Sequence, residues 1–186
     1  LGHAAFQVSS IMTTTGFSTI DFNLWPEFAK VIILLIMITG ACAGSTGGGI
    51  KVARVLILVK SAKNNLMRTL RPRQISRMRI SGAAMEEETV SGVLGYMTIY
   101  CLIAIISILI VSIDGYSLET NISAVMATLN NIGPGFGEVG PMSSFVGYSV
   151  LSNLVLTMDM LIGRLEIFPM LLLFTPSVWK RSSYNN

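Results

Sequence analysis

Five glycines within ten residues interrupt the first long apolar stretch of this chain. The stretch runs from Phe28 to Val59, and its segment VIILLIMI (Val31–Ile38) has the character of a membrane helix. At about 1.5 Å per helical residue the stretch would reach ~48 Å, which exceeds the ~30 Å hydrocarbon core of a bilayer. The glycines, which fall between Gly40 and Gly49, therefore predict a helix that is broken within the membrane.

Composition and two further apolar stretches indicate lipid as the solvent. Charged residues make up 12% of the 186 residues and hydrophobic residues 52%, whereas soluble domains carry roughly 25% charged residues. The second stretch, Val90–Ile113, carries no charge, and the third runs from about Phe145 to Val178 with three charged residues inside it. We expect an all-α integral membrane fold.

Basic residues are concentrated between the first two stretches. Nine of the 13 Lys and Arg residues lie between residues 51 and 79, and two more follow the third stretch. Because loops rich in Lys and Arg stay on the cytoplasmic side, residues 61–88 and 179–186 are expected to be cytoplasmic. The second stretch then runs outward, and DGYSLET (Asp114–Thr120) is an outer turn. Nucleic-acid binding, the alternative for a basic segment, is not expected beside membrane spans.

Two segments each combine a helix of a few turns with a glycine-rich loop. ETNISAVMATLNN is too short and too polar to cross a membrane, and Thr120 or Asn121 is its expected N-cap. It precedes IGPGFGEVGPM, just as HAAFQVSSIM precedes TTTGFSTIDFN near the N-terminus. Irregular backbone is tolerated at membrane depth only inside protein or beside a water-filled cavity. Each segment is therefore predicted to be a re-entrant pore loop.

The two loops belong to copies of one repeated unit. Aligning Gly16 with Gly133 places Gly47 opposite Arg164, since each lies 31 residues downstream. The unit is a helix, a half-helix, a loop and a broken helix. The first copy lacks its opening helix, which predicts a piece of a longer protein. Internal repeats around a central site are typical of transporters and channels. We expect most of one repeat in 1–60, a basic linker in 61–88, a second repeat in 89–178 and a tail in 179–186.

The paired loops suit the passage of a bare cation. Rings of backbone carbonyls can replace the hydration shell of an ion, and glycine adopts the backbone angles that let carbonyls converge. Gly16 in TTTGF and Gly133 in NIGPG each follow a half-helix, whose partly negative C-terminal end favours a cation. The alternative is that both loops are ordinary outer turns.

Taken in order, TTTGF, GSTGGGIK, NIGPGFGEVGP and GRLEIFP resemble the C-terminal half of the Trk/Ktr/HKT-type potassium transporters. In that family four helix–pore loop–helix repeats surround one pore, and each loop contributes a filter glycine. The resemblance implies potassium uptake across the cell inner membrane, with this chain holding the third and fourth repeats. The implied potassium filter consists of the backbone carbonyls of Thr14, Thr15, Gly16, Asn131, Ile132 and Gly133. Among these, Thr15, Gly16, Ile132 and Gly133 are expected to coordinate the potassium ion.

The glycine segment has three interpretations. A phosphate-binding loop fits the spacing of Gly44 and Gly49, but Ile50 stands where lysine should follow. A helix-packing face explains the first glycines, but not three in succession, which cost roughly 3 kcal/mol of helix propensity. The resemblance implies a flexible gate below the filter, formed by Gly44, Ser45, Thr46, Gly47, Gly48 and Gly49.

Arg164 is the other candidate gate residue. An arginine in a membrane helix costs roughly 2.5–3.5 kcal/mol on insertion scales and normally faces a pore or a partner. We expect Arg164 to face the cavity as an electrostatic barrier, with Glu166 or Asp159 as candidate partners. The alternative is that Arg164 serves only in an ion pair between helices.

The resemblance also implies partners. Besides membrane lipid these are a second copy in a homodimer and a cytoplasmic nucleotide-binding regulatory subunit of the TrkA type, with Lys60–Arg79 as part of the docking face. Potassium is the expected substrate, and no covalently bound cofactor is expected. One histidine and no nucleophile–base set give no support to an enzyme. A sodium-permeable relative and a non-conducting fragment or assembly scaffold of the same fold remain alternatives.

Overall fold

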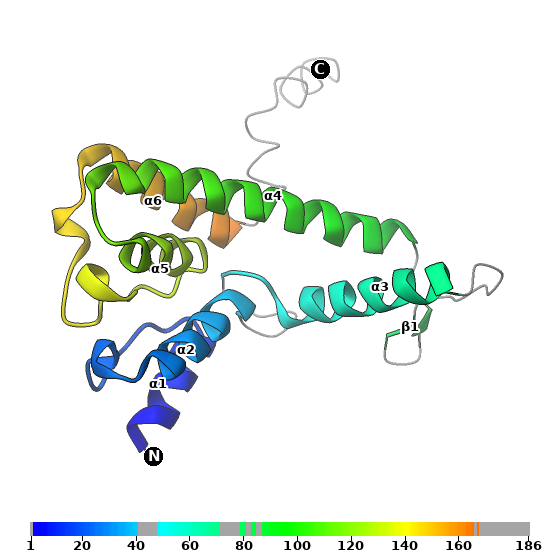
Figure 1. Cartoon of the computed structure of the whole chain (residues 1–186), viewed down its shortest axis with the longest axis horizontal. Helices are drawn as coiled ribbons and strands as arrows, with labels where there is room; N and C mark the ends of the chain where they lie inside the picture. Colours follow the sequence, from blue (N-terminus) through cyan, green and yellow to red (C-terminus); the bar gives the residue numbers. More distant parts are fainter. Residues whose placement is uncertain are drawn as a thin grey trace, which may run out of the picture.

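The described part of the chain is mostly helical (Figure 1). The computed structural model describes residues 2–40, 48–70, 79–80, 83–84, 87–165 and 167. Its α-helices are α1 (Gly2–Met12), α2 (Glu27–Thr39), α3 (Val52–Leu70), α4 (Glu87–Val111), α5 (Leu118–Leu129) and α6 (Val150–Leu165). Two strands of two residues each, β1 (Arg79–Ile80) and β2 (Ala83–Ala84), pair antiparallel between α3 and α4. The sequence did not predict these strands.

The first apolar stretch is divided where the glycines begin. α2 ends at Thr39, and its C-cap Gly40 has a φ of 53°. The next helix, α3, starts at Val52 and continues to Leu70, ten residues past the expected end of the first repeat at residue 60. The predicted break in the stretch is therefore confirmed, and the second helical piece extends into the basic linker.

Among the described helices only α4 is long and apolar enough to cross a membrane. The candidate span covers Glu88–Asp114, and 28% of its apolar window is buried inside the chain. A core helix of a soluble protein would be mostly buried. Instead, Leu102, Ile105 and Leu109 are each more than half exposed. This exposure is the pattern expected of a helix that faces lipid or other membrane helices.

The short helix α5 is the central element of the fold. It packs against α2, α4 and α6 (Figure 1), and eight of its 12 residues are buried. Several of these are polar, and buried polar groups need hydrogen-bond partners. Thr128 donates through Oγ1 to the carbonyl of Ala124 at 2.9 Å, and Asn121 Oδ1 accepts from the Tyr148 hydroxyl at 2.9 Å. α5 is thus a buried helix of three turns, as the half-helix prediction required.

The two halves of the chain share one apolar core. Its buried residues come from α1, the turn before α2, α2 itself, α5 and the loop after α5: Ile11, Phe22, Ile33, Met37, Ala127, Ile132 and Phe136. The rings of Phe22 and Phe136 meet edge to face with centroids 5.4 Å apart. Beside them Asn23 Nδ2 donates to the carbonyl of Gly137 at 3.3 Å, and the Gly137 amide donates back to Asn23 Oδ1 at 3.0 Å.

Two predicted helix starts are wrong. The N-cap of α5 is Ser117, whose hydroxyl oxygen accepts from the Thr120 amide, so the helix begins two to three residues before the expected caps. At the third apolar stretch, Phe145–Gly147 forms a single 3-10 turn, and α6 begins at Val150. At α5 the Ser117 cap starts the helix earlier than the expected caps, whereas before α6 a 3-10 turn takes the place of a helical turn that the apolar pattern allowed.

Candidate functional site

The ends of α1 and α5 have matching backbone conformations. Thr14 and Asn131 lie 117 residues apart and have φ values of 56° and 55°. Two positions later Gly16 and Gly133 have φ values of 80° and 112°. A left-handed conformation is unusual for any residue with a β-carbon and rarer still for a β-branched one such as Thr14. The register of 117 residues is the one that aligns the two glycines in the sequence.

Matching hydrogen bonds close the two helix ends. The amides of Thr14 and Asn131 donate to the carbonyl three residues earlier, at 3.1 and 2.9 Å. The amides of Thr15 and Ile132 donate to the carbonyl five residues earlier, at 2.8 Å in both loops. This pair of bonds around a left-handed residue is a Schellman motif, which ends a helix and satisfies its last carbonyls. Each half-helix therefore stops in the same way just before its glycine.

The two loops meet at Gly16. A β-carbon built on Gly16 would collide with the carbonyl oxygen of Ile132 and lie 3.4 Å from Pro134 Cδ. A β-carbon on Gly133 would meet nothing within 4 Å. Both φ values lie in the region that favours glycine, but only Gly16 is also confined by a neighbouring backbone. The structure thus brings the two predicted filter loops together, with Gly133 beside open space.

The described part of the glycine segment lies against the end of α5. Of the predicted gate residues, Gly44, Ser45, Thr46 and Gly47 lie outside the described residues. Gly48 and Gly49 are buried. A β-carbon on Gly48 would lie 2.6 Å from the carbonyl oxygen of Asn130, and one on Gly49 would collide with Asn130 Oδ1. A β-carbon on Gly40, at the end of α2, would lie 3.1 Å from the Gly48 carbonyl oxygen. Gly40 and Gly48 are therefore close together in space.

Asn130 is a residue of this site that sequence reasoning missed. It is fully buried, its Oδ1 accepts from the Tyr100 hydroxyl at 3.0 Å, and its Nδ2 donates to the carbonyl of Met126 at 2.8 Å. It directly precedes the second predicted filter triplet. The Asn-Asn pair that ends the half-helix was the available signal, but its partners on α4 and in the glycine segment are remote in sequence.

Arg164 lies in the last turn of α6, where its side chain is exposed. Within the described residues it forms no ion pair. Its candidate partner Asp159 instead accepts a hydrogen bond from the Ser107 hydroxyl at 2.9 Å, and Glu166 lies outside the described residues. One turn before Arg164, the carbonyl of Met160 accepts from Asn131 Nδ2 at 3.0 Å, which ties α6 to the second loop.

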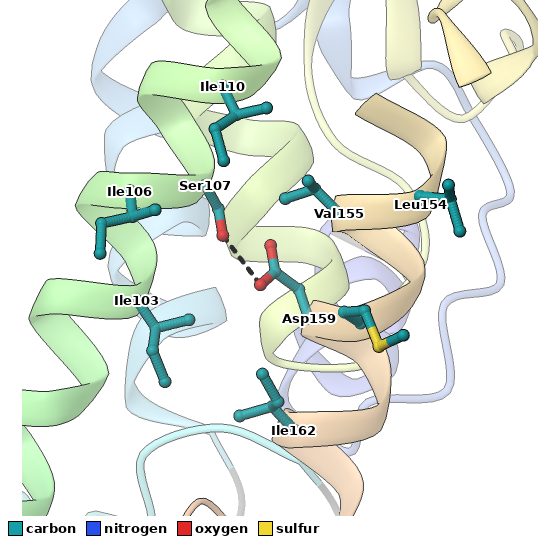
Figure 2. A pocket seen from close by; sticks show the side chains of 9 residues that line it. Ile103, Ile106, Ser107, Ile110, Leu154, Val155, Asp159 and Ile162 are labelled. Atoms are coloured by element: carbon teal, nitrogen blue, oxygen red, sulfur yellow. Dashed lines mark hydrogen bonds between the residues drawn. The ribbon is translucent and has the colours of Figure 1, made fainter. Parts of the chain in front are cut away.

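Asp159 and Ser107 line a groove between α4 and α6 (Figure 2). The groove has a volume of about 420 Å³, and apart from these two residues its walls are apolar. Asp159 is 2% exposed, and its Oδ2 has no hydrogen-bond partner among the described residues. Across the described part of the chain, no group of three or more His, Cys, Asp or Glu side chains could hold a metal ion.

Known proteins are similar to this chain in sequence and in fold. The family model of TrkH, a cation transport protein, matches residues 1–181. The Trk system potassium uptake protein TrkH of Salmonella typhimurium is 39% identical over 97% of this chain and 37% of its own length. The corresponding TrkH of Vibrio parahaemolyticus is 41% identical over 95% of this chain and 36% of its own length.

The crystal structure of the potassium transporter TrkH from Vibrio parahaemolyticus superimposes with a TM-score of 0.82 at 42% identity, over 95% of this chain and 37% of that one. The chain thus spans little more than a third of the length of these relatives. The match confirms the predicted resemblance to the Trk/Ktr/HKT-type potassium transporters, and within them the relatives reported are of the bacterial TrkH type. The chain belongs to the TrkH family of cation transport proteins, which are membrane transporters and not enzymes.

Proposed function

We propose that this chain supplies two of the four pore loops of a potassium uptake protein. The observation that carries the proposal is the repeated Schellman turn at Thr14 and Asn131, followed in each loop by a glycine with positive φ. Two ordinary outer turns would have no reason to share this backbone conformation, whereas two loops that line one pore would. Curated relatives named as Trk system potassium uptake proteins support potassium as the substrate.

The proposed filter uses backbone carbonyls of Thr14–Gly16 and Asn131–Gly133. Potassium would exchange part of its hydration shell for these oxygens, with Thr15, Gly16, Ile132 and Gly133 as its coordinating residues. The C-terminal ends of α1 and α5 precede the two loops, and their partial negative charge favours a cation there. Two further loops, outside this chain, would complete the ring.

The proposed gate is the glycine segment Gly44–Gly49 together with Arg164. The close contact of Gly48 and Gly49 with Asn130 supports a position next to the second filter loop. The exposure of Arg164 and its lack of an ion pair within the described residues support a side chain available to a cavity. In this position its charge would oppose the passage of cations.

The remaining proposals concern location and partners. The chain would lie in the cell inner membrane, with its repeats in 1–60 and 89–178 and with 61–88 and 179–186 on the cytoplasmic side. The exposed apolar side chains of α4 support contact with lipid or with neighbouring helices. A homodimer and a cytoplasmic nucleotide-binding subunit of the TrkA type complete the proposal.

Growth of potassium-starved cells tests the proposed function. The complete gene that encodes this chain should restore growth at low external potassium. The Gly133→Ser variant should restore it poorly, because a side chain at φ 112° strains the loop that carries the proposed coordinating carbonyls. Absence of rescue by the unchanged gene would count against potassium uptake. Equal rescue by both would count against the filter assignment and leave the uptake intact.

A further inference from the structure

We infer that two tyrosines of α4, Tyr96 and Tyr100, anchor the end of the glycine segment and the residues that follow it, and so hold this stretch beside the second filter loop. The anchored stretch, residues 48–55, is called the exit of the glycine segment. The role of the anchor in gating rests on the proposed function. Its structural part, the attachment of the exit to α4, does not.

The first attachment runs through Asn130. The Tyr100 hydroxyl donates to Asn130 Oδ1 at 3.0 Å in a buried position, and the same oxygen faces Gly49 so closely that a β-carbon there would collide with it. The other end of the same amide, Nδ2, donates to the carbonyl of Met126. Asn130 therefore cannot turn without breaking a buried hydrogen bond, and Gly49 is seated against a side chain of fixed orientation.

The second attachment is made by Arg54, five residues after Gly49. The guanidinium carbon of Arg54, in the first turn of α3, lies 3.8 Å from the centroid of the Tyr96 ring. A guanidinium over an aromatic face at this distance is a cation–π contact, which strengthens where water is excluded. Tyr96 is 4% exposed, so the contact is largely shielded on the ring side.

The two attachments converge on one face of α4. Tyr96 and Tyr100 are four residues apart, which places them one above the other on a helix, and their rings stack with centroids 6.5 Å apart and an interplanar angle of 25°. Gly49 contacts Asn130, which is bonded to Tyr100, and Arg54 contacts Tyr96 directly. Both residues are thus connected to the same pair of buried tyrosines. A single contact could be incidental, whereas two contacts within six residues define where the exit lies.

A fixed exit has a consequence for flux through the resting protein. The exit lies directly against Asn130, the residue that precedes the second filter triplet, so a looser exit leaves this loop less well supported. Loss of the anchor is then expected to raise flux in the resting state without altering which ion the filter prefers.

The Tyr100→Phe variant tests the anchor by removing one hydroxyl. The chain offers a matched control in Tyr148→Phe, because the Tyr148 hydroxyl also donates to a buried Asn Oδ1 of α5, at 2.9 Å, but at the opposite end of that helix. Arg54→Lys serves as a second variant, since lysine keeps the charge but loses the planar guanidinium that stacks on a ring. All are made in the complete protein, purified in detergent and reconstituted into vesicles.

Two readouts separate the anchor from the proposed function. Amide hydrogen exchange of residues 48–55 should be about fivefold faster in Tyr100→Phe, the change that corresponds to one hydrogen bond of typical net strength, and faster in Arg54→Lys. It should be unchanged in Tyr148→Phe. Resting rubidium flux into vesicles should rise in the first two variants at an unchanged preference for potassium over sodium.

Each outcome decides one part of the inference. Unchanged exchange in Tyr100→Phe and Arg54→Lys, or an equal rise in Tyr148→Phe, would overturn the anchor. Faster exchange with unchanged resting flux would overturn its role in gating. If the unchanged protein carried no rubidium, the proposed function would fail, and the exchange measurement would still establish or overturn the anchor.

Discussion

At the scale of single residues, the two predicted filter glycines have different surroundings. Gly16 has both a positive φ and a backbone carbonyl in the way of any side chain, whereas Gly133 has only the positive φ. A left-handed conformation costs an ordinary residue roughly 1–2 kcal/mol, but a collision with a backbone atom must also displace the Ile132 loop. The two glycines therefore occupy matching positions in the sequence, but Gly16 tolerates a side chain less well than Gly133.

This difference predicts an order of severity. Gly16→Ala should lower the initial rate of rubidium uptake by the complete protein about tenfold or more, because the Ile132 carbonyl would have to move and about 1.4 kcal/mol corresponds to tenfold. Gly133→Ala should cause a smaller loss. Uptake rates of the two variants at equal expression provide the measurement. A larger loss for Gly133→Ala than for Gly16→Ala would contradict the contact between the loops.

Sequence reasoning identified the two glycines but not the residues that hold them. Gly16 and Gly133 could be aligned because the repeat places them at matching points after two half-helices. The Schellman turn at Thr14 carries no local signal, since a left-handed threonine contradicts its own preference, whereas asparagine, as at Asn131, adopts this conformation more readily. The contacts of Asn130 with Tyr100 and Gly49 join three segments remote from one another in sequence, so no local pattern encodes them.

At the scale of helices, Ser107 of α4 and Asp159 of α6 form a hydrogen bond in an apolar groove (Figure 2). Ser107→Ala should lower the free energy of unfolding by about 1–3 kcal/mol, because it leaves the buried Asp159 carboxyl without its donor. Asp159→Leu should cost less, because it removes the carboxyl itself and leaves behind only a neutral hydroxyl without its acceptor.

Thermal unfolding of the single variants and of the double variant in detergent tests this pair. The double variant should have the same thermal midpoint as Asp159→Leu alone, because without the carboxyl the Ser107 hydroxyl no longer has its acceptor. If the two losses simply added, the hydrogen bond between Ser107 and Asp159 would contribute nothing to the packing of α4 on α6.

The outer ends of α5 and α6 meet at Tyr148, which predicts a dependence on alkaline pH. Burial raises the pKa of the Tyr148 hydroxyl to about 12 from its ordinary value of 10, and nearby Tyr116 and Asp114 add to the shift. The folded protein therefore favours the neutral form of Tyr148, whose hydroxyl donates to Asn121, over the ionised form. Its contribution to stability is complete below pH 10 and is lost as the pH rises through 12.

The comparison of wild-type protein with Tyr148→Phe isolates this contribution. The thermal midpoint of the wild type should fall more steeply between pH 10 and 12 than that of the variant, since the variant has no phenol to ionise at this position. Parallel curves over this range would show that ionisation of Tyr148 does not act on the fold.

Helix positions were more predictable than helix ends. The half-helices α1 and α5 and the division of the first apolar stretch follow from length, polarity and glycine content. The start of α5 at Leu118 was missed because Ser117, Thr120 and Asn121 can all act as N-caps. The late start of α6 was missed because an apolar pattern does not distinguish a 3-10 turn from the first turn of a helix.

At the scale of the whole molecule, the two halves are held together close to the predicted filter. The amide of Asn23 both donates to and accepts from the backbone of Gly137, next to the edge-to-face pair of Phe22 and Phe136. Asn23→Ala should lower the free energy of unfolding by about 1–3 kcal/mol, because two hydrogen bonds of about 0.5–1.5 kcal/mol each are lost. Leu24→Ala is the control, because Leu24 is 86% exposed.

Thermal midpoints of both variants check this expectation. A fall for Asn23→Ala with no change for Leu24→Ala would assign the contact between the halves to this amide. A midpoint equal to that of the wild type would show that the shared apolar core holds the halves together without it.

The sequence indicated two repeats but not how they face each other. Internal alignment predicted the repeat, and the family match shows that the chain belongs to a family of transporters. The close approach of Gly16 to Ile132, and the shared core that includes Ile11, Ala127 and Phe136, depend on packing between segments over 100 residues apart. Residues so distant are brought together by the fold as a whole, which a search for local patterns does not address.

The relative uptake of potassium and sodium by vesicles that contain the complete protein tests the central claim most directly. If Gly16 and Gly133 line one filter, Gly16→Ser and Gly133→Ser should each lower the preference for potassium, because each distorts carbonyls of the same ring. An unchanged preference in both variants, at measurable uptake, would contradict a filter formed by these two loops.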